Sequence, residues 1–304
     1  MSVRTLVLFS PSAAVSPTAS LRRAVKRLGA IGFEAAVDAD ALARHRSLAG
    51  TDEQRLSALH RVAAAAPGVA MATVGGYGLT RLLDSIRWPV LARSVERGTR
   101  WVGHGDFTTL QLALLAHTGA GSWAGPMACG DFGRSDAESG VDEVTRDCFA
   151  EALDGSLEAV GFRTAPGFDG LQARGLLWGG DLTSVLSLLG TRHWPAKAAR
   201  GGVLFLEDAD ADPCRTERGL LQLRQAGVLQ AQRAVLLGLS GSHRTRAPQR
   251  AGRAFDAALA RVRDGLKTPL LMGLPVGPAQ PRLSLPLGRR VQVVAQGRDV
   301  LIGW

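Results

Sequence analysis

Short apolar runs alternate with helical patterns through the first half of the chain. The runs at residues 5–9 and 69–74 are bounded by polar or turn-forming positions and predict buried strands. Helical periodicity covers residues 21–28 and 51–66, and the second of these helices starts at Thr51 with the spacing of a capping box. Strands that alternate with helices in this way predict a mostly parallel sheet covered by helices on both faces.

The second half of the chain repeats this order after an interruption. Glycine and proline residues break any regular period between Asp154 and Arg174. We therefore expect two α/β domains, residues 1–155 and 174–304, joined by a linker at 156–173. In the second domain the pattern predicts strands at 202–206, 234–237 and 269–272, helices at 215–226 and 254–262, and a β-rich end over 282–303.

The composition is that of a globular protein, with 304 residues of which 46% are hydrophobic and 21% charged. No apolar stretch approaches the roughly 20 residues that span a bilayer, and the run at residues 5–9 is too short for a signal-peptide core. Neither the three cysteines nor the six histidines have the spacing of a zinc site. We therefore expect a cytoplasmic protein without a disulfide, a metal ion or a membrane segment.

The net charge does not change the expectation of a globular cytoplasmic protein. The formal charge is +9 and the pI is near 10.7. The basic residues are spread along helical patterns, and a single tyrosine offers little for stacking on bases. A solvated basic surface is therefore favoured over nucleic-acid binding, and it would attract acidic peptides.

Residues 101–115 carry the most informative pattern. A short apolar run ends in Gly-His-Gly-Asp, and an amphipathic helix pattern begins at once. This is the layout of a nucleophile elbow, in which a strand turns sharply into a helix and the tip residue projects, backed by a backbone N–H and the helix dipole. The tip residue here is Gly105, which has no side chain to project but adopts positive φ without steric cost.

A glycine loop, Gly75-Gly76-Tyr77-Gly78, follows the predicted strand at 69–74. Its spacing differs from the dinucleotide fingerprint, and no acidic residue is well placed for a ribose. We therefore expect no nucleotide and no other organic cofactor.

Blocks along nearly the whole chain resemble the serine LD-carboxypeptidases, which remove the terminal D-alanine from murein tetrapeptides. In this family the elbow reads Gly-His-Ser-Asp-Phe-Thr. The other blocks, in the same order as in the family, are Phe9-Ser10-Pro11-Ser12, Ala49-Gly50-Thr51, Gly75-Gly76-Tyr77-Gly78, Ala124-Gly125-Pro126-Met127, Leu177-Trp178-Gly179-Gly180-Asp181-Leu182, Leu206-Glu207-Asp208, Thr216-Glu217-Arg218, Gly273-Leu274-Pro275 and Leu283-Ser284-Leu285-Pro286-Leu287-Gly288.

The resemblance implies an N-terminal flavodoxin-like domain, a C-terminal swivelling domain, and a site in the cleft between them. Of the family's Ser-Glu-His triad, Glu207 matches the glutamate, whereas Gly105 stands at the serine position and Pro278 at the histidine position. The oxyanion hole would use the N–H of Gly75 or Gly76 together with that of Asp106. Family members are commonly homodimers, which we expect here too.

Other positions also depart from the family pattern. Val74 replaces an arginine, and Asp181 replaces an asparagine, which makes the acidic substrate of the family less certain. His243 is the best candidate for a displaced base, although a loop histidine is more often merely solvated. His104 has a counterpart in the family, so we expect it to pack or to form a hydrogen bond.

Two functions remain from these residues. The first is a family member with a degenerate triad, which binds a murein tetrapeptide or a related D-amino-acid peptide with little or no hydrolysis. The second is an enzyme: a carboxypeptidase that acts through relocated residues, or a repurposed acid/base enzyme that uses Glu207, Asp106 and Asp181. An engineered Ser→Gly change is a further explanation for Gly105, but it would not explain Pro278.

Overall fold

The protein consists of two α/β units, each with its own sheet. The computed structural model describes residues 4–208, 212–239, 248–277 and 281–304, with the backbone alone at 239 and 248–253. The first unit comprises Met1–Leu157 and Pro281–Leu287, and the second comprises Glu158–Gln280 and Gly288–Trp304. Two α/β domains are therefore confirmed, and the chain returns to the first unit near its end.

The first unit has a six-stranded sheet with the strand order β11-β5-β4-β3-β1-β2. The five strands from β1 to β5 are parallel and have the 2-1-3-4-5 order of flavodoxin-like sheets, whereas β11 is antiparallel to β5. The strands are β1 (Arg4–Phe9), β2 (Phe33–Val37), β3 (Val69–Ala72), β4 (Arg100–Gly103), β5 (Ser122–Ala124) and β11 (Leu285–Leu287).

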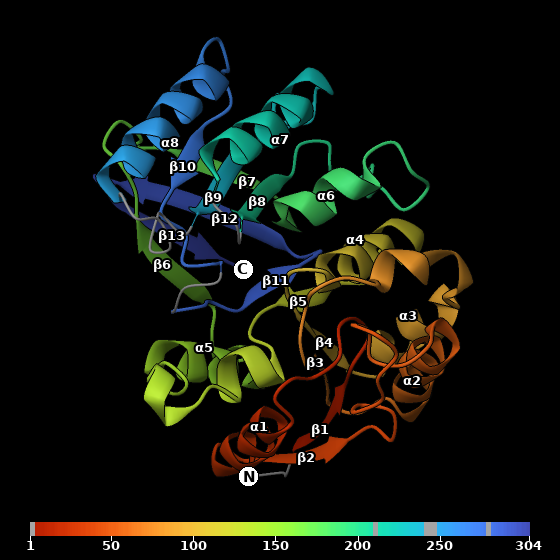
Figure 1. Ribbon diagram of the computed structural model, residues 1–304. Coiled ribbons are helices and arrows are strands. Elements are labelled where there is room, and N and C mark those ends of the chain that lie inside the picture. Colours follow the sequence, from red (N-terminus) through yellow and green to blue (C-terminus); the bar gives the residue numbers. More distant parts are fainter. Residues whose placement is uncertain (1–3, 209–211, 240–247, 278–280) are drawn as a thin grey trace. The chain divides into compact units, whose positions relative to one another are not determined.

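Helices cover both faces of this sheet (Figure 1). On one face α2, α3 and α4 pack side by side, and on the other α1 packs against the π-helical turn η3. These elements are α1 (Ala19–Ala30), α2 (Asp52–Ala65), η1 (Leu79–Arg81), η2 (Leu83–Ser85), α3 (Trp88–Glu96), α4 (Phe107–Thr118), η3 (Ala128–Phe132), η4 (Asp136–Glu138) and α5 (Glu143–Asp154). The predicted capping box is present: the Thr51 side chain accepts from the Gln54 N–H, and the Gln54 side chain accepts from the Thr51 N–H.

The core of the first unit fixes the junction between β4 and α4. Phe107, the first residue of α4, is buried against Phe9 of β1, and their ring centroids are 6.2 Å apart. Trp101 of β4 packs edge-on against the same Phe9 ring at 5.5 Å. The amphipathic pattern expected for this helix is wrong, because every residue from Phe107 to Leu114 is buried. Because α4 is enclosed on all sides, the polar Gln111 must bond internally, and its amide donates to the Trp123 carbonyl at 2.7 Å.

The second unit has a seven-stranded mixed sheet with the order β10-β9-β8-β7-β12-β13-β6. Strands β7 to β10 are parallel, whereas β12, β13 and β6 pair antiparallel, as expected for a β-rich end. Helices α6, α7 and α8 lie in a row beside this sheet (Figure 1). The elements are β6 (Ala159–Arg163), β7 (Gln172–Asp181), α6 (Leu182–Leu188), β8 (Val203–Asp208), α7 (Pro213–Gln225), β9 (Ala234–Leu239), α8 (Pro248–Arg263), β10 (Leu270–Met272), β12 (Arg290–Gln296) and β13 (Asp299–Gly303).

The boundary between the units differs from the expected linker at 156–173. Strand β6 lies inside that interval and pairs with β13 across the register Val160↔Ile302. Its sequence, Ala-Val-Gly-Phe-Arg, alternates too briefly to stand out among neighbouring glycines. Pairing with a strand more than a hundred residues away stabilises it, which no local pattern indicates.

We predict that Gly103→Ala destabilises the first unit. A Cβ at this position would lie 2.7 Å from Cγ of Phe107, so the buried ring would have to move. Overpacking of this kind costs about 1–3 kcal/mol of unfolding free energy, which urea denaturation measures. Gly29→Ala in α1 is the matched control, because its Cβ would meet nothing within 4 Å and the change should be neutral or stabilising. Equal stability of both variants would show that the Phe107 ring does not constrain this position.

Candidate functional site

The predicted elbow is present in the first unit. Strand β4 ends at Gly103, and α4 begins at Phe107 after a three-residue turn. Gly105 at the tip has φ of +61°, the left-handed conformation typical of the tip of an elbow. A Cβ added to Gly105 would meet nothing within 4 Å, so this position has room for a side chain.

The glycine loop lies directly beside the elbow. Strand β3 ends at Ala72, two residues earlier than predicted, which leaves Val74 in the loop. A Cβ on Gly75 would lie 3.8 Å from the backbone nitrogen of Asp106. Among the described residues, no hydrogen bond uses the N–H of Gly75, Gly76 or Asp106 as its donor. Backbone N–H groups without internal acceptors can bind a negatively charged oxygen.

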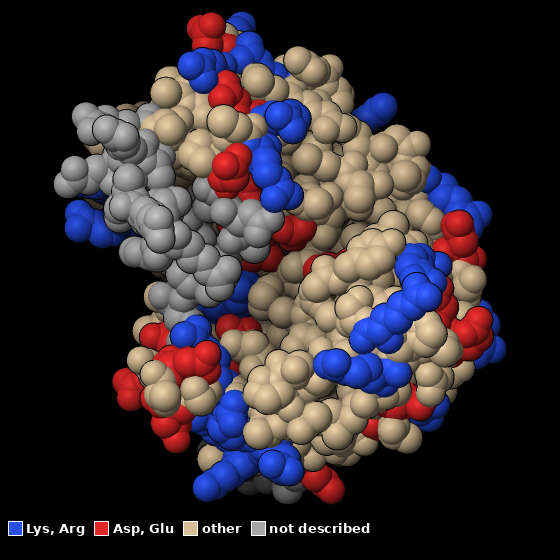
Figure 2. Space-filling model, viewed as in Figure 1, with Lys and Arg blue, Asp and Glu red and all other residues tan. Residues whose placement is uncertain are grey.

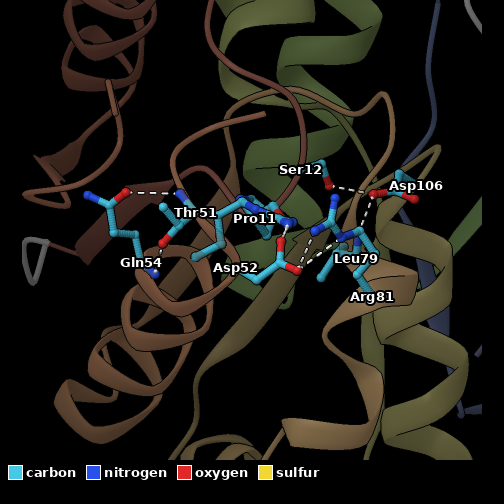
Figure 3. Close-up of polar contacts among 9 residues, drawn as sticks. Pro11, Ser12, Thr51, Asp52, Gln54, Leu79, Arg81 and Asp106 are labelled. Atoms are coloured by element: carbon cyan, nitrogen blue, oxygen red, sulfur yellow. Dashed lines mark hydrogen bonds and ion pairs between the residues drawn. The ribbon is translucent and has the colours of Figure 1, made fainter. Parts of the chain in front are cut away.

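The Asp106 side chain is buried and occupied by protein contacts. Its Oδ2 atom accepts from the Ser12 hydroxyl at 2.7 Å and from the Leu79 N–H at 2.9 Å (Figure 3). Burial raises the pKa of this carboxyl, and the two hydrogen bonds and the charge of Arg55 act in the opposite direction. A carboxylate that holds two loops is poorly placed to move a proton to a ligand, which argues against an acid/base role for Asp106.

His104, on the other side of Gly105, faces a buried carboxylate that sequence reasoning missed. The His104 Nε2 atom lies 3.5 Å from Oδ2 of Asp131, and Oδ1 of Asp131 lies 3.8 Å from Nε of Arg282. The Met127 N–H donates to Asp131 at 2.7 Å. Burial alone would raise the pKa of Asp131, but His104, Arg282 and the Met127 amide together lower it to about 2. The only local signal for Asp131 is its position four residues after the Gly-Pro-Met block.

In the second unit, Glu207 and Asp181 lie on neighbouring strands. They are register partners at the carboxyl ends of β8 and β7, the edge at which ligands bind in parallel α/β sheets. Glu207 is buried, as is Asp208 beside it, whose carboxylate accepts from the Thr216 hydroxyl.

Asp181 caps helix α6. Its Oδ2 atom accepts from the Ser184 N–H at 2.8 Å and from the Ser184 hydroxyl at 2.7 Å. Burial raises the pKa of Asp181, the bonds from Ser184 lower it, and the charges of Glu207 and Asp208 raise it further. Asparagine, which the family resemblance predicts here, caps a helix equally well, so this difference preserves a structural role.

Two of the predicted site residues, Pro278 and His243, lie outside the described residues. Within the described residues, no group of three or more His, Cys, Asp and Glu side chains is arranged to hold a metal ion. None of the described helices is long and apolar enough to cross a membrane.

The fold and the elbow together define an α/β protein with a left-handed turn between a strand and a helix, and comparisons with known proteins narrow this class. The family model for the LD-carboxypeptidase N-terminal domain matches residues 6–125, and the model for the C-terminal domain matches residues 174–293. The chain therefore belongs to the LD-carboxypeptidase family.

Individual relatives agree with this family. The crystal structure of muramoyltetrapeptide carboxypeptidase from Oxalobacter formigenes is similar with a TM-score of 0.85 and 32% identity, over 98% of this chain and 97% of that chain. The murein tetrapeptide carboxypeptidase of Pseudomonas aeruginosa is 27% identical over 292 residues, 93% of this chain and 91% of that protein. A protein of Streptomyces coelicolor is 34% identical over 194 residues, which are 63% of this chain and 59% of that protein.

We predict that Asp131→Asn destabilises the protein in a pH-dependent way. The folded pKa of Asp131, about 2, lies below the ordinary value of 3.8, so the unfolded chain binds more protons between these values. The stability that Asp131 contributes is thus complete above about pH 5 and is lost as the pH falls toward 2. A tenfold change in proton affinity corresponds to about 1.4 kcal/mol, so this contribution amounts to roughly 2 kcal/mol.

Guanidinium denaturation of the wild type and Asp131→Asn at pH 7, 4.5 and 3 measures this difference. We expect the gap in unfolding free energy to be nearly equal at pH 7 and pH 4.5 and to narrow at pH 3. A gap that does not change down to pH 3 would contradict the depressed pKa.

Proposed function

We propose that this protein binds a murein tetrapeptide or a related peptide with a D-amino acid, and hydrolyses it little or not at all. The observation that carries the proposal is Gly105 at the tip of the elbow. The resemblance to the family assigns the nucleophile to this position and the histidine base to Pro278. Glycine has no atom that attacks a carbonyl, and proline can neither accept nor return the proton.

The ligand-binding part of the proposal is supported by the N–H groups beside Gly105. Those of Gly75, Gly76 and Asp106 have no acceptor among the described residues, so they can bind the oxygen of a peptide carbonyl. In the second unit, Glu207, which the resemblance assigns to the triad, lies at the carboxyl end of β8. Such donors leave a residual catalysis of roughly 10³- to 10⁴-fold over water in comparable triads, far below that of a working peptidase.

The charge distribution fits an acidic peptide ligand better than a polyanion. On the face drawn in Figure 2, basic side chains are scattered over several elements with acidic side chains among them. The formal charge of +9 would still attract carboxylates of a stem peptide over a distance. Cytoplasmic residence and a homodimer are proposals that rest on the family resemblance.

An active hydrolase is the second candidate, and the names of the relatives favour it. The similar proteins from Oxalobacter formigenes and Pseudomonas aeruginosa are both named as tetrapeptide carboxypeptidases. Such activity here would need a nucleophile other than Gly105, with His243 or another group as the base. It would also be expected to depend on Glu207, because Asp106 and Asp181 are engaged in structural hydrogen bonds.

The two candidates differ in their products. Murein tetrapeptide is added to the wild type, and heat of binding and released D-alanine are measured on the same sample. We expect saturable binding and D-alanine release at no more than about a thousandth of the rate of the Pseudomonas aeruginosa relative, consistent with loss of a nucleophile. Release at the relative's rate, abolished by Glu207→Ala, would establish the hydrolase instead.

We predict that the double variant Gly105→Ser, Pro278→His gains D-alanine release of at least about 100-fold over the wild type. The serine has space, because a Cβ at this position meets nothing within 4 Å, although the positive φ costs about 1–2 kcal/mol. Gly105→Ala, Pro278→His is the matched control, since it has the same backbone strain without a hydroxyl. Equal release by both double variants would show that the serine position has been assigned wrongly.

A further inference from the structure

A cluster of polar side chains, in which Asp106, Ser12 and Arg55 are buried, lies beside the elbow. It contains Asp106, Ser12, Arg55, Asp52 and Arg81 together with the Leu79 N–H, and is called the elbow clamp below (Figure 3). None of these side chains belongs to the triad. All of them lie in the first unit, and they come from four separate segments of the chain.

The Asp106 carboxylate joins three of these segments through one atom. Its Oδ2 accepts from Ser12 in the loop after β1 and from Leu79 at the end of the glycine loop. Asp106 itself lies in the turn after β4. One oxygen thus connects the loops that follow three adjacent strands, at the edge of the sheet where Gly105 lies.

Arg55 of α2 bonds directly to the loop after β1 and is linked through Asp52 to Arg81, after the glycine loop. Its side chain is fully buried, and it donates to the Pro11 carbonyl at 2.8 Å and to Asp52. Asp52 also pairs with Arg81 at 2.7 Å, directly after the glycine loop. The glycine loop is therefore held at its end by both Asp106 and the Asp52–Arg81 pair.

The Arg55 guanidinium fits into this cluster because Gly78 has no side chain. A Cβ on Gly78 would lie 2.7 Å from one terminal nitrogen of the Arg55 guanidinium, and its φ is +135°. Any other residue would displace the guanidinium or strain the loop. The last glycine of the Gly-Gly-Tyr-Gly motif is thus required by the buried Arg55 side chain, which packs directly against it.

Buried charges are a costly way to close loops. Arg55 Nε has no hydrogen-bond partner among the described residues, and a buried donor without a partner costs about 1–3 kcal/mol. Apolar contacts would hold the same loops without the desolvation penalty of buried charges. Hydrogen bonds, however, fix direction and distance, which matters where N–H groups must converge on a single oxygen.

We propose that Asp106 and Arg55 are positioning residues, which hold the segment Gly75–Leu79 so that its N–H groups and the Asp106 N–H bind one oxygen of the peptide. The binding part of this statement rests on the proposed function. The holding of the loop does not, because it concerns the protein without ligand.

The ligand-free test is hydrogen exchange of the Leu79 amide. Asp106→Ala removes the oxygen that accepts from both the Leu79 N–H and the Ser12 hydroxyl, and we expect exchange of the Leu79 amide to accelerate at least about tenfold. Ser12→Ala keeps the Leu79 bond and should cause a smaller acceleration. This variant can still be measured if Asp106→Ala folds poorly. Exchange that is unchanged in both variants would overturn the proposal.

The binding test separates positioning from loss of stability. Calorimetry with murein tetrapeptide should give at least about tenfold weaker binding for Asp106→Ala than for the wild type. Asp106→Asn should recover most of the affinity, because its amide oxygen can accept from both Ser12 and Leu79. Asp38→Ala is the control: this buried carboxylate pairs with Arg61 in the same unit without contacting the clamp, so stability should fall but binding should not.

Equal loss of binding in Asp106→Asn and Asp106→Ala would overturn the positioning role, because it would show that the charge itself is required. Weakened binding in Asp38→Ala would likewise overturn it in favour of a general effect on folding. If the wild type binds no tetrapeptide, the proposed function is wrong. The claim that the loop N–H groups and the Asp106 N–H bind one oxygen of the peptide is then wrong as well. The exchange measurement still decides separately whether the clamp holds the loop.

Discussion

The left-handed turn at Gly105 is the constraint on which the first unit's site depends. The turn connects a buried strand to a helix that is buried on every side over its first two turns. Neither element can shift to relax the turn, because Phe107 is packed against Phe9 and would collide with any side chain at Gly103. The backbone N–H of Asp106 and the side chains of His104 and Asp106 therefore have fixed positions around the tip.

The groups that we propose to bind the peptide are held independently of Gly105, the position at which the family resemblance places the nucleophile. The Asp106 carboxylate is held by hydrogen bonds from the Ser12 hydroxyl and the Leu79 N–H, and neither bond uses an atom of Gly105. A glycine at position 105 is consequently compatible with the surrounding geometry. The family membership and the proposed loss of the nucleophile do not conflict, because none of these contacts requires a side chain at the tip.

Local patterns predicted the elements that have local causes. The capping box at Thr51 and the strand-turn-helix at the elbow are both present, because hydrogen bonds and turn geometry within a few residues determine them. Strand β6 and the return of 281–287 to the first sheet were missed, since each depends on pairing with a distant strand. The roles of Asp106 and Asp131 were missed for the same reason.

The resemblance to the family supplied the site, which composition and periodicity alone did not indicate. It brought together Gly105, Gly75 and Asp106, and the structure places these three side by side. The resemblance did not show which departures from the family pattern change the chemistry of the site and which keep a structural role. Asp181 illustrates this, because its carboxylate caps α6 as an asparagine would.

A crystal structure of the unmodified protein, grown after prolonged incubation with murein tetrapeptide, tests the central claim most directly. We predict an uncleaved peptide with one carbonyl oxygen within hydrogen-bond distance of the Asp106 N–H and of the N–H of Gly75 or Gly76. A peptide that has lost its terminal D-alanine, or one bound away from Gly105, would contradict it.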